Sequence, residues 1–129
     1  MSIVKVNSNA INNGSITAED IADDTITYVK LSAPTGTNNV ALGNTSLDSG
    51  SLSGGNNTGI GNAALTVNTS GDNNVAVGNL TLDANTTGSC NLGNGMYSLT
   101  ANISGDCNTA VGYASLASNT TADNNTAVG

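Results

Sequence analysis

The sequence predicts an all-β protein, a parallel β-solenoid built from coils of ~17 residues. Three observations lead to this class. A six-residue pattern that ends in glycine recurs from Asn38 to Gly129, and successive glycines are 18, 17, 17, 17 and 17 residues apart. A leucine follows each of the first five glycines by four residues. The repeat is also too short and too rich in Gly and Asn for a pair of helices, because known helical repeats need ~30 residues or more.

Each repeat is expected to form one coil, which consists of a short strand, a turn, a second short strand and another turn. The run from Thr109 to Gly112 is small and β-branched, as is typical of a strand, whereas residues 119–125 are turn-forming Asn, Thr and Asp. Stacked coils pair their backbone groups with the coils above and below at a spacing of ~4.8 Å. The stability of such a stack is a sum over neighbouring coils.

Two columns of apolar residues are expected to form the core of the stack, one directly before the glycine and one four residues after it. Their members are Leu42, Leu47, Ile60, Leu65, Val77, Leu82, Leu99, Val111 and Leu116. Two residues before the glycine there is always Ala or Gly, so this column must face either the opposite wall of a thin coil or another chain. The recurring asparagines are expected to stack as hydrogen-bonded ladders.

Composition supports a thin, linear molecule. The 129 residues include no Trp or Phe and only three Tyr, and 37% are hydrophobic, mostly small aliphatic residues. Low aromatic content is also typical of disorder, but the fixed spacing of Val and Leu from Gly favours folded coils. The net charge is −7, with Lys5 and Lys30 as the only cations, which excludes nucleic-acid binding through phosphates. No stretch reaches the ~20 apolar residues of a membrane span, so no membrane insertion is expected.

The chain before the repeats has a different character, and we expect residues 1–37 to form a short extended or helical arm followed by a linker. The segment from Ser15 to Leu31 reads Ser-Ile-Thr-x-x-Asp-Ile-x-Asp-x-Thr-Ile-Thr-x-x-Lys-Leu. It resembles the N-terminal segment of phage tail fibres, which docks the fibre onto the baseplate or tail. The resemblance implies docking and trimer contacts for the apolar residues of the arm. These are Ile3, Val4, Val6, Ile16, Ile21, Ile26 and Leu31.

The repeats from Asn38 to Gly129 carry the signature Asn-x-Ala-Val-Gly-x-x-(Ala/Ser)-Leu. This signature resembles the head repeats of trimeric autotransporter adhesins, which also occur in phage fibres. Those heads are left-handed parallel β-rolls of three chains around one axis. The resemblance therefore implies a homotrimer and a left-handed coil, although the present period is longer than the mid-teens usual in that family.

Cys90 and Cys107 are 17 residues apart and occupy the same repeat position. In a solenoid their Cα atoms would be ~4.8 Å apart, inside the ~4.4–6.8 Å window of a disulfide. The two alternatives are a disulfide and a stacked pair of thiols. Assembly in a reducing cytoplasm favours the thiols.

No other group points to chemistry. Asp72, Asp106 and Asp123 share one repeat position, but their spacing matches no calcium-binding loop, so solvated turn residues are expected rather than a metal site. Asn-x-Ser/Thr triplets such as Asn68-Thr69-Ser70 and Asn85-Thr86-Thr87 match a glycosylation acceptor but fit turns and ladders better. The chain has no histidine and no Gly-x-Ser-x-Gly element, so we expect no enzyme and no cofactor.

The first functional hypothesis is therefore structural. The chain is expected to be the N-terminal part of a phage tail fibre in the virion, assembled in the host cytoplasm. Its partners would be itself, as a homotrimer, a baseplate or tail adaptor protein through the arm, and a host receptor through a distal region. The alternative is a bacterial cell-surface adhesin whose solenoid binds a ligand. A third hypothesis, ice binding by a flat Thr array, is weak because Ile103 interrupts the column formed by Thr69, Thr86 and Thr120.

Overall fold

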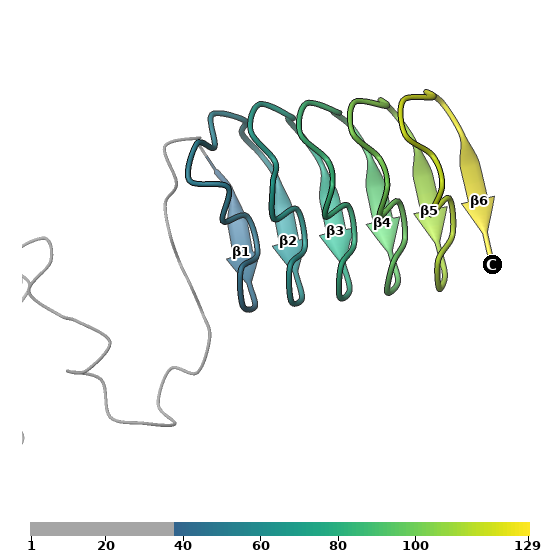
Figure 1. Cartoon of the computed structure of the whole chain (residues 1–129), viewed down its shortest axis with the longest axis horizontal. Coiled ribbons are helices and arrows are strands. Elements are labelled where there is room, and N and C mark those ends of the chain that lie inside the picture. Colours follow the sequence, from purple (N-terminus) through teal and green to yellow (C-terminus); the bar gives the residue numbers. More distant parts are fainter. Residues whose placement is uncertain (1–37) are drawn as a thin grey trace, which may run out of the picture.

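The computed structural model describes residues 38–129, and the predicted arm with its docking residues lies outside the described range. The described part contains six strands of three residues each. They are β1 (Val40–Leu42), β2 (Thr58–Ile60), β3 (Val75–Val77), β4 (Leu92–Asn94), β5 (Thr109–Val111) and β6 (Thr126–Val128). All six form one parallel sheet in the order β1-β2-β3-β4-β5-β6, so each repeat adds one strand (Figure 1). The predicted parallel β-solenoid of ~17-residue coils is confirmed.

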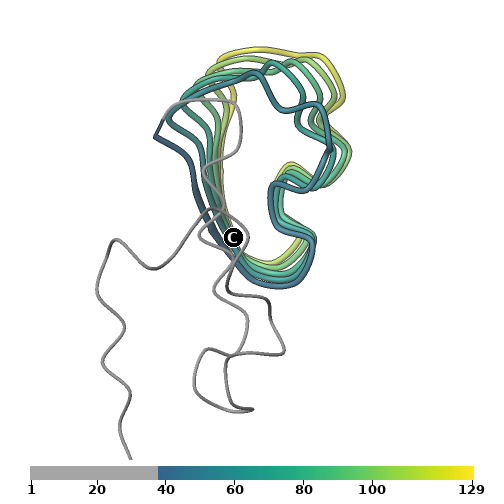
Figure 2. The same cartoon turned by 90° about the vertical axis from the view of Figure 1, so that its left-hand side faces the viewer.

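Equivalent positions of successive repeats lie directly beside one another. Between β3 and β4, for example, Val75 pairs with Leu92 and Ala76 pairs with Gly93. Viewed along the stack, the coils superimpose on one outline that is folded inward on one side (Figure 2). The repeat period read from the sequence is thus the register of the sheet, and every column of the sequence becomes a column of side chains.

The wall opposite the sheet differs from the expectation, because each described coil has one strand rather than two. After each strand, every second residue has a positive φ: Gly78 (136°), Leu80 (54°) and Leu82 (52°) in one coil. This alternation curls the backbone, so the segment is not extended. Its backbone groups still bond between coils, since the Leu82 N–H donates to the Ser98 carbonyl at 3.1 Å.

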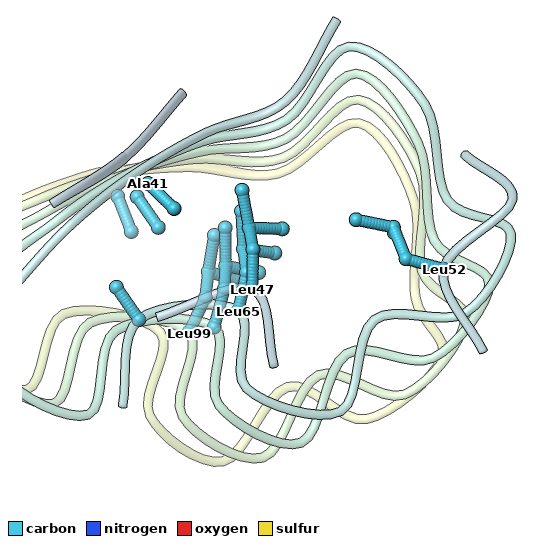
Figure 3. Packing of buried hydrophobic residues seen from close by; sticks show 9 residues of the cluster. Ala41, Leu47, Leu52, Leu65 and Leu99 are labelled. Carbon is cyan, nitrogen blue, oxygen red and sulfur yellow. The ribbon is translucent and has the colours of Figure 1, made fainter. Parts of the chain in front are cut away.

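The core is the column of leucines four residues after each glycine, which we call the leucine column. Leu47, Leu65, Leu82 and Leu99 are at most 3% exposed, and Leu116 is partly buried against them. The alanines of the sheet, such as Ala41, lie opposite this column across the interior (Figure 3). The Ala or Gly column two residues before the glycine therefore faces the opposite wall of a thin coil, which is one of the two alternatives predicted for it.

The residues directly before the glycines are not in this core, and the prediction for four of them is wrong for the single chain. Ile60 is 37% exposed, and Leu42, Val77 and Val111 are half-buried. The reason is the alternation of side chains along a strand. Once the alanine two residues before the glycine faces inward, its neighbours on both sides must face outward.

Candidate functional site: buried ladders and the outer sheet face

Most of the buried polar side chains are asparagines, and these lie in two columns. The first, the strand-side asparagine column, lies four residues before each glycine and consists of Asn39, Asn57, Asn74, Asn91, Asn108 and Asn125. Asn91 shows its bonding: Oδ1 accepts from the Asn108 backbone N–H at 2.9 Å and from Asn108 Nδ2 at 3.2 Å. Its Nδ2 donates to Asn74 Oδ1 at 3.1 Å and to the Gly105 carbonyl at 2.8 Å. The Asn91 amide therefore joins three successive coils.

The second, the turn-side asparagine column, consists of Asn68, Asn85, Asn102 and Asn119, seven residues after the glycine. Asn85 Nδ2 donates to Asn68 Oδ1 and to the Gly88 carbonyl, both at 2.9 Å. The Gly88 carbonyl also accepts from Asn74 Nδ2 at 2.8 Å, so the two columns meet at one oxygen. The predicted ladders are present, and these amides are occupied by one another rather than directed at a ligand.

Burial also decides between the alternatives for the triplets that begin at Asn68 and Asn85. Asn68 and Asn85 are 0% exposed, so their amides cannot be reached in the folded coil. Their threonines add further bonds between coils, for example from Thr69 Oγ1 to the Thr86 carbonyl at 2.9 Å. These two triplets therefore serve turn and ladder formation.

The aspartates eleven residues after the glycine have a backbone role. Asp106 Oδ1 accepts from the Ser89 N–H at 2.7 Å, and Asp123 Oδ1 accepts from the Asp106 N–H at the same distance. Asp72 Oδ1 likewise accepts from the Gly55 N–H at 2.7 Å. Within residues 38–129 no group of three or more His, Cys, Asp or Glu side chains could hold a metal ion.

Cys90 and Cys107 are both free thiols at the surface of adjacent coils. The Cys107 N–H donates to the carbonyl of Ser89, the residue before Cys90, at 3.0 Å, which sets the two cysteines side by side. Desolvation, the charge and the hydrogen bond of the adjacent Cys90 thiol, and the carboxylates of Asp106 and Asp123 all raise the pKa of the Cys107 thiol. Of the two alternatives, a disulfide and a stacked pair of thiols, the structure has the pair of thiols.

The outward side of the sheet carries no charged side chain. We call it the outer face, and it carries two side chains from each strand: Val40, Leu42, Thr58, Ile60, Val75, Val77, Leu92, Asn94, Thr109, Val111, Thr126 and Val128. Val40 is 48% exposed and Val75 is 36% exposed, although both are apolar. Asn94 is the only member with an amide, and no member is charged. Contiguous apolar surface of this kind typically marks an interaction site.

Two features had no counterpart in the sequence predictions. Leu52 lies in residues 49–55, an insertion in the first repeat, which is one residue longer than the later repeats. Its side chain is 4% exposed and lies in the interior apart from Leu47 and Leu65 (Figure 3). Leu52 is the only large apolar residue of that insertion, and this is the feature of the sequence from which its burial could have been predicted. The second feature is a group formed by Met96, Tyr97 and Tyr113. Met96 and Tyr113 are exposed, Tyr97 is half-buried, and the two tyrosine rings meet edge to face with centroids 6.0 Å apart.

Comparisons with protein-family models, with curated proteins and with solved structures find no match for this chain. Within residues 38–129, no helix has the length and apolar character to cross a membrane. The structure establishes the β-solenoid fold.

Proposed function

We propose that this chain is a structural fibre protein in which residues 38–129 form a stiff shaft. The observation that carries the proposal is that polar side chains form hydrogen bonds between neighbouring coils. The buried asparagines bond to equivalent asparagines of neighbouring coils, and the turn aspartates bond to backbone N–H groups of neighbouring coils. Such bonding resists bending and shear between coils and presents little convergent chemistry to a small ligand. A spacer is the function that this arrangement supports best.

The shaft is proposed to be a homotrimer that associates through the outer face. The described residues carry five aspartates and no cation, so two copies repel each other wherever their turns meet. The outer face is the uncharged, apolar surface that runs the length of the stack. Its burial against further copies would remove exposed Val and Ile side chains from water. The likeness to adhesin head repeats supports three chains around one axis.

The arm gives the proposal its biological setting. Because residues 15–31 resemble the docking segment of phage tail fibres, we propose a virion protein that is assembled in the host cytoplasm and attached through residues 1–37 to a tail or baseplate protein. A receptor-binding tip at the distal end of the fibre would then contact the host. The absence of cations in the shaft keeps it from adhering to nucleic acid during assembly.

A bacterial cell-surface adhesin is the second candidate, and one observation favours it. Tyr113 is 67% exposed and Met96 is 42% exposed, on a turn where earlier repeats have Asn44, Asn62 and Asn79. Exposed aromatic side chains are typical of binding surfaces. In that case the solenoid itself would bind a ligand, rather than hold a tip away from the particle.

Particle incorporation separates these functions. We expect a chain without residues 1–31 to remain a soluble rod that no longer joins particles of the phage that encodes it, because the docking segment is missing. A matched control deletes residues 79–95, one whole coil, and should join particles normally. Electron microscopy and immunoblotting of purified particles provide the measurement. Normal incorporation of the chain without residues 1–31 would refute the docking role, and incorporation of neither the full chain nor the control would refute the fibre function.

A further inference from the structure

We propose that Cys90 and Cys107 form a modification site, at which a small-molecule disulfide converts two stacked thiols into an intrachain disulfide that ties two adjacent coils together. This inference concerns the repeats alone and does not depend on the fibre function. In the structure both cysteines are free thiols, and the proposal assigns a reaction to them.

The geometry places both thiols in equivalent positions. Cys90 and Cys107 lie five residues before their glycines and have the same backbone conformation, with φ values of 58° and 57°. Two residues further on, Leu92 and Thr109 are direct partners in the sheet. The Cα atoms of the cysteines are therefore one coil apart, ~4.8 Å, which a disulfide can span.

Another pair of coils shows that side chains in this column reach each other. Asn38 and Asn56 occupy the same repeat position, and Asn38 Nδ2 donates to Asn56 Oδ1 at 3.3 Å. The two cysteine side chains are adjacent in the same way, since the Cys90 thiol is among the groups that raise the pKa of the Cys107 thiol. Both cysteines are exposed, so an oxidant in solution can reach them.

The reaction is thiol–disulfide exchange with a compound R–S–S–R such as oxidised glutathione. One cysteine loses its proton to solvent, and its thiolate attacks a sulfur of R–S–S–R. This forms a mixed disulfide and releases RS⁻, which takes up a proton. The thiolate of the other cysteine then attacks the protein sulfur of the mixed disulfide and releases the second RS⁻. Two protein thiols are oxidised, and one R–S–S–R is reduced to two RSH.

The surroundings of the pair make this reaction slow at neutral pH and faster in alkali. The groups that face Cys107 are the Cys90 thiol and the carboxylates of Asp106 and Asp123, and each favours the neutral thiol and raises its pKa. Below the pKa the thiolate fraction, and with it the rate, rises about tenfold per pH unit. The pair therefore remains reduced in a cytoplasm that contains reduced glutathione, and it closes in an oxidising medium.

The test uses the full chain, reduced and then incubated with oxidised glutathione at pH 8. We expect a mass lower by two hydrogen atoms, no bound glutathione, and a protease fragment in which Cys90 is linked to Cys107. The oxidised chain should also unfold at a higher urea concentration than the reduced chain. The matched controls are Cys90→Asn and Cys107→Asn, because asparagine occupies this position in the other four repeats. Each control should stop at one bound glutathione.

A kinetic measurement provides a second readout. In Cys90→Asn the remaining Cys107 loses the neighbouring thiol that raises its pKa, so it should react faster with Ellman's reagent at pH 7 than in the unmodified sequence. The proposal is overturned if the unmodified sequence ends with two bound glutathiones, with unreacted thiols, or with disulfides between chains. An unchanged Cys107 rate in Cys90→Asn would also contradict it.

Discussion

The leucine column shows how single residues accept an unfavourable backbone. Leu82 has a φ of 52° and is 0% exposed, and its equivalents Leu65 and Leu99 are alike. A left-handed conformation costs an L-residue about 1–2 kcal/mol. Full burial of a leucine side chain contributes about 1.5–3 kcal/mol, which offsets that cost. The strained conformation persists because it directs the side chain into the interior of a thin coil.

A neighbouring position gives a prediction about hydrogen bonding. Ser46 and Ser98 occupy the same repeat position, and both are at most 1% exposed. Ser46 Oγ donates to the Gly59 carbonyl at 2.9 Å, whereas Ser98 Oγ has no hydrogen-bond partner among the described residues. We expect Ser46→Ala to lower the free energy of unfolding by about 1 kcal/mol. Ser98→Ala should leave it unchanged or raise it, because it removes an unpaired buried hydroxyl. Alanine fits here, since Ala64 occupies the same column.

Urea unfolding of both variants measures this difference. Ser46→Ala is the matched control for Ser98→Ala, since the two substitutions delete the same atom from the same column. Equal losses of stability would contradict the assignment of an unpaired hydroxyl to Ser98.

At the scale of the element, the sequence determines the sheet but not the opposite wall. The period of 17 fixes which residues pair, so the register from Val40 to Val128 follows from spacing alone. The curled wall does not, because nothing in the type of Leu80 or Leu82 indicates a left-handed backbone. For a three-residue strand, periodicity cannot say which side faces inward. The assignment of Ile60 to the core failed for this reason.

The surface features were predictable to different degrees. The stacked position of Cys90 and Cys107 follows from the period, but their free state and their exposure are visible only in the structure. The uncharged character of the outer face is visible in the sequence, whereas its exposure depends on the inward direction of Ala76 and its equivalents. The group of Tyr97 and Tyr113 follows from their spacing of 16 residues only once the coil is known.

The outer face yields a prediction about association. Val77 lies in the middle of this face, and Val77→Asp should weaken self-association about a hundredfold or more, because association would then bury an unpaired carboxylate. Ser70→Asp adds the same charge to an exposed turn and serves as the control. Asn94→Val completes the apolar column and should strengthen association. Analytical ultracentrifugation over a range of concentrations provides the measurement, with circular dichroism to verify folding. Equal association of all three variants would rule out the outer face as the interface.

The whole molecule is a stack in which each coil contacts only its neighbours. Consecutive strands alone pair in the described sheet, and the same three-residue register recurs at every step. Stability is then a sum of coils and of the interfaces between them. The shaft can therefore vary in length by whole coils while its cross-section stays the same, which is a suitable property for a spacer.

Deletion of a whole coil tests this view of the molecule. Removal of residues 79–95 joins Gly78 to Met96, so Leu99 again lies four residues after a glycine and takes the place of Leu82 above Leu65. We expect the variant to fold, to be shorter by ~4.8 Å in small-angle X-ray scattering, and to have a smaller urea m-value, because less surface is exposed on unfolding. Removal of residues 79–86 shifts every later column by half a coil and should prevent folding of the repeats after it. If both deletions were tolerated equally, as judged by circular dichroism, the stacking of equivalent residues would not be what holds the chain together.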